Sequence, residues 1–421
     1  MAYPILTSQE LLDSGTFQVT VLSDFTGLPI SGAQVEIQPT QEIEAAPVTE
    51  SLSTDTSGQT EIISLPAPPV ELSMEPGDIQ PYSEYSLFVR AEGYQTLTIQ
   101  GSEVFSGQKS IQTAILRPLG SVEAPSSIVI PPNTLFGDFP PKIAEEEIKP
   151  VNETGEIVLS RVVVPETVVV HDGVPTNSSA PDYFVPYKDY IKNVASSEIY
   201  STWPRSTITA NVLAIMSFTL NRVYTEWYRN KGFDFTITTS TAYDQKYVFG
   251  RPVFDSISEV VDEIFTAYLS RPNVKQPIFT QYCDGKNVTC PNWLSQWGSK
   301  ALGDQGYSAI DILRNYYGSS IYINTAEEIA GIPYSWPGTN LDIGSSGQKV
   351  YQLQEQLNTI GTAYPAIPSI TVDGMYGEAT KNAVREFQSV FGLPATGITD
   401  YATWFKISEI FVGVSKIAER A

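Results

Sequence analysis

Glu198 is the residue of this chain best placed to do acid–base chemistry. It stands near the end of residues 185–204, a stretch whose apolar side chains recur at the spacing of an amphipathic helix. Pro204 disfavours helix in the residue before it, and Ser206 or Thr207 can cap a second helix. We therefore expect Glu198 at the junction of two helices.

The neighbours of Glu198 bear on what its carboxyl group can do. A carboxyl group held against apolar and aromatic side chains resists ionisation, so it can act as a general acid near neutral pH. Ile199, Tyr200 and Trp203 are such neighbours. Once ionised, the same group can take a proton back, and this pair of roles suits cleavage of a glycosidic bond. A lone glutamate at a helix end is more often simply solvated, so the residue alone does not decide between these interpretations.

Three blocks around and after Glu198 resemble the SpoIID family, the stage II sporulation lytic transglycosylases. The first block is 189–220, with a serine–glutamate pair, Trp-Pro and an Ala-bearing helix. The second holds residues 232–235 and 245–247, and the third runs from 294 to 317. Because the blocks keep their order, the resemblance implies an α+β catalytic domain in which Glu198 is the catalytic acid.

The chain departs from that family where metal ligands and an arginine can stand. Tyr243 and Asp244 replace His and Cys ligands, residues 289–293 replace a stretch with glycine and histidine, and Met216 replaces the arginine. We therefore predict no metal and no other cofactor. Other residues of the region are candidates for orienting sugar hydroxyls or amides, each explained equally well by packing. The candidates for substrate binding are Tyr200, Trp203, Asp244, Gln245, Tyr247, Tyr282, Ser295 and Gln296.

Histidine and cysteine are scarce in this chain. His171, the only histidine, follows a Val-rich run, where a structural role is more common than metal ligation. Cys283 and Cys290 can close a short disulfide loop or remain as reduced thiols. Synthesis in a cytosol favours the thiols.

The C-terminal segment, residues 341–415, contains three helical patterns separated by turns such as Asp373-Gly374 and Thr396-Gly397. It resembles the peptidoglycan-binding type 1 domain, which implies a three-helix bundle. Most matching positions are core and turn residues. Only exposed loop and aromatic positions are therefore expected to contact glycan or peptide.

The N-terminal segment, residues 14–118, alternates apolar and polar side chains in short runs separated by glycine and proline, which predicts a β-sandwich. It resembles transthyretin-like or carboxypeptidase-regulatory-like modules and has no convergent catalytic set. We interpret it as a pro-region or an adhesion module. The Pro- and Ser-rich segment that follows predicts an extended, exposed linker of the kind that proteases cut.

The chain is therefore predicted to be a multidomain α+β protein. Its parts are a leader (1–13), a β-sandwich (14–118), a linker (119–145), a SpoIID-like domain (146–330), a second linker (331–340) and a peptidoglycan-binding domain (341–415). This order resembles the SleC family of spore cortex-lytic enzymes. The resemblance implies an inactive precursor, activated by a subtilisin-like germination protease that cuts in or near residues 117–131.

The charge distribution narrows the possible partners. The net charge is −22 at pH 7, and residues 1–157 hold 22 acidic and 5 basic residues against 25 and 20 in the remainder. Such an acidic surface argues against nucleic acid or anionic membrane as a partner. No segment is long and apolar enough to insert in a membrane, and the N-terminus lacks the pattern of a secretory signal.

These features predict synthesis in a mother-cell cytosol and action on the peptidoglycan of the spore cortex. The expected reaction is lytic transglycosylation between N-acetylmuramic acid and N-acetylglucosamine. Two alternatives stay open, namely an N-acetylmuramoyl-L-alanine amidase and a non-catalytic peptidoglycan-binding structural protein of the spore.

Overall fold

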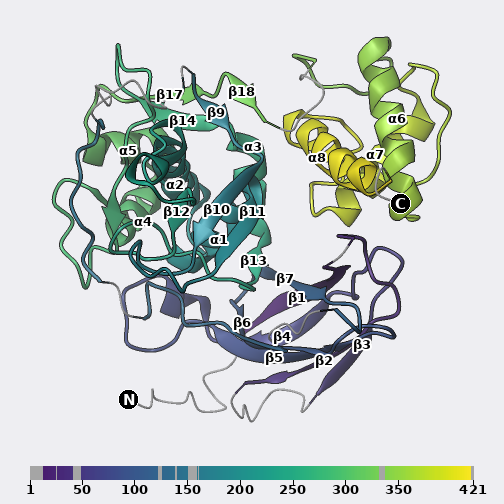
Figure 1. The fold of residues 1–421 in the computed structure, drawn as a ribbon, viewed down its shortest axis with the longest axis horizontal. Coiled ribbons are helices and arrows are strands. Elements are labelled where there is room, and N and C mark those ends of the chain that lie inside the picture. Colours follow the sequence, from purple (N-terminus) through teal and green to yellow (C-terminus); the bar gives the residue numbers. More distant parts are fainter. Residues whose placement is uncertain are drawn as a thin grey trace.

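A computed structural model describes residues 13–24, 26–40, 49–121, 126–137, 140–149, 159, 161–330 and 337–418. The expected leader therefore lies outside the described residues except for Asp13, and so does most of the linker expected at 331–340. Within the described ranges the chain is a multidomain α+β protein with several β-sheets and eight α-helices (Figure 1).

Two β-sheets form the N-terminal module, with strand orders β13-β7-β1-β4 and β3-β2-β5-β6-β8. Alternate side chains, such as Phe17, Val19 and Val21, enter one apolar core that both sheets share. This is the face-to-face packing that the alternating pattern predicts. The strands are β1 (Asp13–Ser23), β2 (Gln34–Pro39), β3 (Glu50–Ser53), β4 (Ile63–Ala67), β5 (Ser83–Arg90), β6 (Leu97–Val104), β7 (Lys109–Leu116), β8 (Ser127–Val129) and β13 (Val253–Phe254).

The strand β13 comes from the central part of the chain and joins the N-terminal sheet. It pairs antiparallel with β7, so that Phe254 lies opposite Ser110. Just before β13, the Nη1 atom of Arg251 donates to Oε1 of Glu103 at 2.5 Å, and both side chains are buried. The N-terminal module is therefore attached to the central part by a shared sheet as well as by the chain itself.

The helix α2 (Arg205–Tyr224) lies at the centre of the middle part (Figure 1). Nearly all of its side chains are buried, because it is apolar or uncharged on almost every side. It contacts the four other helices of this part. These are α1 (Tyr187–Glu198), α3 (Asp255–Ile264), α4 (Gln296–Asp304) and α5 (Ala309–Tyr317).

The start of α2 differs from the prediction. Pro204, with φ −53° and ψ 141°, is the residue that precedes the helix, and no side chain caps it. Because the helix begins directly after this proline, Ser206 and Thr207 lie inside its first turn. The prediction that one of them caps the helix is therefore wrong.

Short strands complete the central part. They form one three-stranded sheet, β11-β10-β12, and three two-stranded sheets, β14-β17, β15-β16 and β18-β9. Their bounds are β9 (Val163–Val164), β10 (Thr167–His171), β11 (Asp182–Pro186), β12 (Ile237–Thr238), β14 (Ala267–Ser270), β15 (Tyr282–Cys283), β16 (Leu294–Ser295), β17 (Tyr322–Thr325) and β18 (Glu328–Ile329).

Three helices form the C-terminal part, as predicted: α6 (Gln348–Ala363), α7 (Glu378–Val390) and α8 (Tyr401–Ala418). The buried amide of Gln354 fixes the turn before α7, since its Oε1 accepts from the N–H groups of Asp373 (3.0 Å) and Gly374 (2.8 Å).

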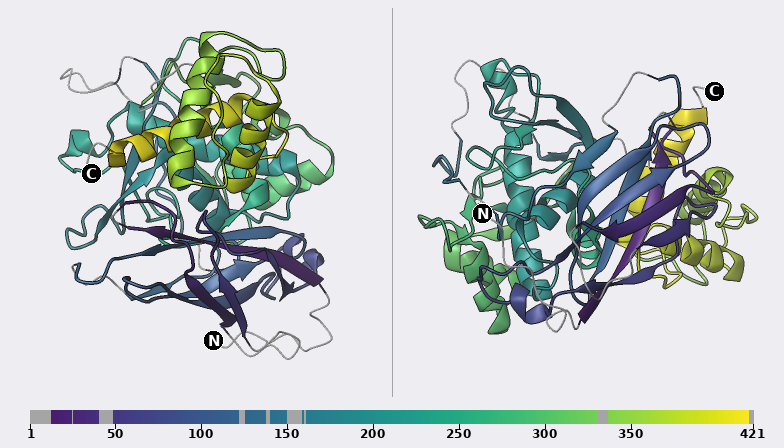
Figure 2. Two further views of the ribbon diagram at one scale, coloured as in Figure 1. Left: turned by 90° about the vertical axis from the view of Figure 1, so that its right-hand side faces the viewer. Right: turned by 90° about the horizontal axis from the view of Figure 1, so that it is seen from below.

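The bundle rests on both other parts of the molecule (Figure 2). The ring of Phe405 packs against Phe265 of the central part at 5.3 Å, and Gln59 of the N-terminal module donates to the Val390 carbonyl at 2.6 Å. Among the described helices, none combines the length and apolar character needed to cross a bilayer.

Candidate active site

Glu198 is the last residue of α1 and is completely buried. Its Oε1 atom accepts a hydrogen bond from the backbone N–H of Lys246 at 2.7 Å. Its Oε2 atom has no hydrogen-bond partner among the described residues. The carboxyl group therefore does not face bulk water, and only one of its two oxygens accepts a hydrogen bond from the described residues.

Burial raises the pKa of Glu198 above its ordinary value. The Lys142 ammonium, the Tyr282 hydroxyl and the Lys246 N–H oppose this shift without cancelling it. The Tyr282 hydroxyl lies close enough to Glu198 to lower the pKa of the carboxyl group as a hydrogen-bond donor would, although the contact falls outside strict hydrogen-bond geometry. The protonated carboxyl group that general acid catalysis requires is thus favoured here.

A segment expected to be an exposed linker packs against the helix that carries Glu198. Asn133 Nδ2 donates to the Ser196 carbonyl at 3.1 Å, and the N–H and Oγ1 of Thr134 both donate to the Ser197 carbonyl at 3.0 Å. These are carbonyls of the last turn of α1, which lack partners within the helix. The expectation of an exposed linker is therefore wrong for this stretch, because its polar groups complete the end of α1.

Tyr200 and Trp203 belong to a buried aromatic cluster next to Glu198 in the sequence. Their rings lie 5.8 Å apart, and Trp297 lies 5.8 Å from Tyr200 and 5.0 Å from Trp203. The N-terminal module closes this cluster. Phe105 lies 5.3 Å from the Tyr200 ring, and the Ser73 carbonyl accepts from Trp203 Nε1 at 3.0 Å.

Both carboxylate oxygens of Asp244 accept hydrogen bonds from neighbouring protein groups. Its Oδ1 accepts from Arg222 Nε at 2.8 Å, and its Oδ2 accepts from Tyr228 (2.6 Å) and from the N–H and hydroxyl of Thr238 (2.9 and 2.7 Å). The side chain is completely buried. These contacts favour a structural role.

Gln245 is held in the same way. Its Oε1 accepts from Tyr190 at 3.1 Å and from Thr219 at 2.8 Å, and its Nε2 donates to the Ile215 carbonyl at 3.1 Å. Tyr247 stacks on Tyr190 with 5.8 Å between ring centroids. These contacts fix the loop that contains Lys246, whose backbone N–H donates to Glu198.

Ser295 and Gln296 lie at the start of α4. The Ser295 hydroxyl accepts from the Gly298 N–H at 2.9 Å and so caps the helix. Gln296 is completely buried, and neither polar atom of its amide has a hydrogen-bond partner among the described residues. A buried amide without partners is costly, so Gln296 remains a candidate for contact with a ligand.

Lys142 is a site residue that sequence reasoning missed. Its Nζ atom donates to the Asp244 carbonyl and lies 4.7 Å from the centre of the Tyr282 ring. Burial lowers the pKa of Lys142, while the negative charge of Glu198 opposes that shift. Nothing in a proline-bearing segment far from Glu198 in sequence signals this contact.

Arg222 was also missed, although it lies in a helix that the sequence predicted. It is buried and pairs with Asp244 and with Glu145, whose Oε1 accepts from Nη2 at 2.7 Å. A lone arginine near the end of an apolar helix is the signal that could have found it, since a buried guanidinium needs carboxylate partners.

The contacts of His171 favour a structural role, although its Nε2 atom has no hydrogen-bond partner among the described residues. It is buried, its Nδ1 lies 2.8 Å from Asp182 Oδ1, and its ring stacks on Phe235 at 4.5 Å. Within the described ranges, no group of three or more His, Cys, Asp or Glu side chains is arranged to hold a metal ion.

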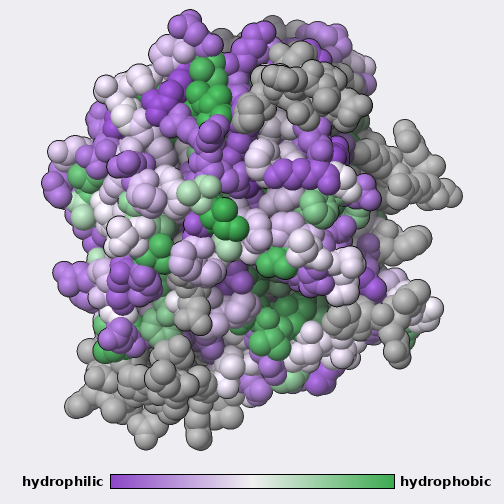
Figure 3. All heavy atoms as spheres, turned by 60° about the vertical axis from the view of Figure 1, so that its left-hand side comes forward, coloured by the Kyte–Doolittle hydropathy of each residue, from purple (hydrophilic) through white to green (hydrophobic). Residues whose placement is uncertain are grey.

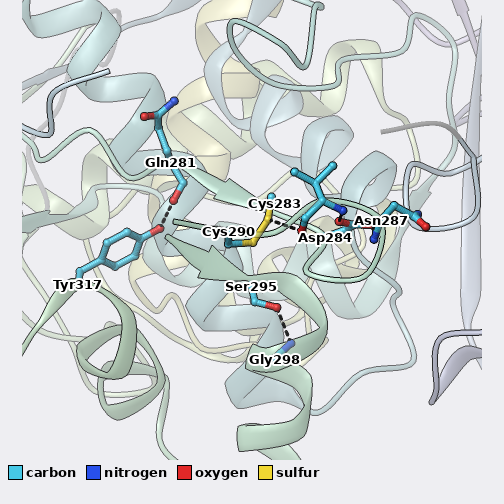
Figure 4. The surroundings of a disulfide bond; sticks show 9 residues. Gln281, Cys283, Asp284, Asn287, Cys290, Ser295, Gly298 and Tyr317 are labelled. Atoms are coloured by element: carbon cyan, nitrogen blue, oxygen red, sulfur yellow. Dashed lines mark hydrogen bonds between the residues drawn. A yellow bond between two sulfur atoms is a disulfide. The ribbon is translucent and has the colours of Figure 1, made fainter. Parts of the chain in front are cut away.

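Cys283 and Cys290 form a disulfide, with their Cα atoms 5.7 Å apart (Figure 4). The carboxylate of Asp284 accepts from the N–H groups of Asn287 (2.8 Å) and Val288 (3.0 Å), and this turn brings Cys290 back to Cys283. The preference for reduced thiols is therefore wrong.

Comparison with known proteins supports the C-terminal part most directly. Residues 346–407 match the family model of a peptidoglycan binding domain. The chain is 45% identical over 78 residues to a zinc D-Ala-D-Ala carboxypeptidase of Streptomyces albus G. That match covers 18% of this chain and 29% of the carboxypeptidase. A peptidoglycan-binding type 1 domain is thus present, and this chain spans less than a third of the length of the carboxypeptidase.

Similarity to solved structures is distant. Catechol 1,2-dioxygenase of Acinetobacter radioresistens is 17% identical with a TM-score of 0.20, covering 28% of this chain and 55% of that one. The TIE protein of Bacillus anthracis is 15% identical with a TM-score of 0.17, covering 25% and 17%. These values carry no argument about function.

Proposed function

We propose that the chain is the precursor of a lytic transglycosylase that cleaves the peptidoglycan of the spore cortex during germination. The observation that carries the proposal is the environment of Glu198. Its carboxyl group is completely buried, one of its oxygens has no hydrogen-bond partner within the described ranges, and burial raises its pKa. A raised pKa of this kind favours the protonated form that a general acid needs.

The proposed reaction needs one acid. Protonated Glu198 donates its proton to the glycosidic oxygen between N-acetylmuramic acid and N-acetylglucosamine, and that bond breaks. The 6-hydroxyl of the muramic acid ring then attacks the resulting cationic carbon. Ionised Glu198 takes the hydroxyl proton, which restores the acid and leaves a 1,6-anhydro end. A second carboxylate nucleophile is unnecessary because the attacking hydroxyl belongs to the same sugar.

The closed state of the site supports a precursor. Glu198 cannot reach a polymer from its buried position, and the N-terminal module covers Tyr200 and Trp203 through Phe105 and Ser73. The proposed cut by a subtilisin-like germination protease lies in or near residues 117–131. Leu119 in that stretch is 65% exposed and lies outside the strands, so a protease can reach it, whereas Val129 is held in β8.

The C-terminal bundle supplies attachment to the insoluble substrate. Exposed apolar side chains gather where two of its loops meet, at the bridge between Ser346 and Met375. Met375 is 65% exposed and Ile343 is 50% exposed, and Tyr351 lies beside Gly374 of the same turn. We assign this surface to contact with peptidoglycan, which keeps the central part close to its substrate.

Product analysis of digested cortex tests the reaction class. Trimmed protein, cut between residues 117 and 131, is expected to release fragments with 1,6-anhydromuramic ends, identified by mass spectrometry. The uncut chain is the matched control and is expected to release far fewer. Freed peptide stems would instead indicate an amidase, and intact cortex would indicate a structural protein.

A further inference from the structure

A cavity of about 390 Å³ lies beside the disulfide loop, on the central part of the molecule. Its walls are formed by the disulfide loop, by Ser295, which caps α4, and by two residues near the end of α5. Its lining includes Thr289, Asn292, Trp293, Ser295, Asn315 and Tyr316. Its volume falls in the range of small-molecule sites, roughly 300–1,000 Å³.

The lining of this cavity selects a neutral, hydrogen-bonding ligand. None of its eight lining residues carries a charge, although the chain as a whole has a net charge of −22. Two half-buried aromatic rings, Trp293 and Tyr316, offer flat apolar surface. The amides of Asn292 and Asn315 offer both donors and acceptors.

We propose that this cavity binds an N-acetylated amino sugar of the glycan strand. The ring face of such a sugar is apolar and fits against Trp293, while its hydroxyl and acetamido groups pair with the asparagine amides. This inference rests on the proposed function, because it takes glycan as the substrate, and it adds a binding site away from Glu198.

The site is built to keep its shape. The disulfide fixes both ends of the loop, and the Asp284 carboxylate holds the turn between them (Figure 4). Space around the Ser295 hydroxyl depends on two glycines. A Cβ atom at Gly285 would lie 1.9 Å from Ser295 Oγ, and one at Gly298 would lie 2.2 Å from the Tyr316 hydroxyl.

The strand β15 relates this cavity to the candidate acid. Tyr282 is buried and acts on Glu198, while the next residue, Cys283, is bonded to Cys290 in the cavity wall. Neighbouring residues of a strand point to opposite faces. The cavity and the acid therefore lie on opposite faces of one strand, so the cavity is a binding site separate from Glu198.

Figure 3 turns the left-hand side of Figure 1 towards the viewer, the side on which α4 and α5 lie. On this face apolar side chains form separate groups among hydrophilic residues (Figure 3). A broad apolar face would indicate a protein partner. The mixed surface suits a hydrated polymer better.

The test is calorimetric titration of the intact chain with tetra-N-acetylchitotetraose. Trp293→Ala is expected to weaken binding by at least about tenfold, equivalent to roughly 1.4 kcal/mol. Asn315→Ala is expected to weaken it several-fold. Tyr307→Ala is the matched control, since Tyr307 is an exposed aromatic residue just before α5 that does not line the cavity, and binding should be unchanged.

Reduction of the disulfide provides a second arm that removes no lining side chain. It should weaken binding by the wild type and have no further effect on Trp293→Ala, with folding checked by thermal melting. Unchanged affinity in Trp293→Ala, or no binding by the wild type, overturns the proposal. So does displacement of the tetrasaccharide by a sugar-free stem peptide. Binding at this cavity without anhydro products from trimmed protein would refute the catalytic proposal alone.

Discussion

Phe105→Ala should loosen the N-terminal module from the central part. The Phe105 ring is completely buried and contacts Tyr82 of its own module at 5.1 Å. It also contacts two rings of the central part, Tyr200 at 5.3 Å and Phe254 at 5.2 Å. Truncating a buried phenylalanine to alanine costs about 3–5 kcal/mol.

Two of the three ring contacts cross between the parts, so roughly two thirds of this cost belongs to docking. Docking should therefore weaken by about 2–3 kcal/mol, which is roughly 30- to 150-fold. The assay cuts the linker near residues 117–131 and follows the separation of the two fragments by analytical gel filtration across a dilution series. Cortex digestion by the cut protein is measured in parallel and should start sooner in Phe105→Ala.

Ile115→Ala is the control, because Ile115 lies on β7 but is exposed. The two fragments of cut Ile115→Ala should separate at the same protein concentration as those of the cut wild type. The reasoning fails if cut Phe105→Ala stays associated as tightly as the wild type while the module remains folded by circular dichroism.

Three further predictions concern stability. Burial raises the pKa of Glu103 to about 7 from an ordinary value near 4.5, so the folded state binds the extra proton in this range. The free energy of unfolding should then fall by up to about 3 kcal/mol as pH rises from 4.5 through 7, and Glu103→Gln should flatten that slope in urea titrations. Cys283→Ser should cost roughly 2–3 kcal/mol through the loss of a short loop closure, and an unchanged melting temperature would contradict this. Gln354→Ala leaves the two turn N–H groups of Asp373 and Gly374 unpaired and should lower the free energy of unfolding by about 1–3 kcal/mol, measured by denaturant unfolding. The control Gln352→Ala, on the same helix, should leave the free energy of unfolding unchanged.

The parts that local pattern controls could be predicted from the sequence. Alternation gave β1, β2, β4, β5, β6 and β7, and helical spacing gave α1, α2 and the C-terminal bundle. The short strand β3 was not predicted, because four residues carry too little alternation to stand out. Glu198 was placed at the end of its helix by Pro204 and by the resemblance around it.

Contacts that depend on tertiary packing could not be predicted. Lys142 reaches the surroundings of Glu198 from a segment whose composition indicates an exposed linker. Likewise, β13 completes a sheet whose other strands precede it by more than a hundred residues. Both contacts join segments far apart in the chain, and no periodicity within either segment records the partner.

The disulfide between Cys283 and Cys290 was mispredicted for a different reason. The choice between thiols and a bond between Cys283 and Cys290 was made from the expected compartment, not from the turn that separates them. The side chain of Asp284 accepts two backbone hydrogen bonds and so holds the turn between the two cysteines.

The most direct test of the account is the rate at which trimmed Glu198→Gln forms 1,6-anhydromuramic ends on cortex. Glutamine keeps the shape of the side chain and can still accept from the Lys246 N–H, but it has no proton to donate. We predict a fall of at least about 10²-fold relative to the wild type. Glu263→Gln, an exposed carboxylate of α3, should not change the rate. A Glu198→Gln rate within about twofold of the wild type would contradict the acid role of Glu198.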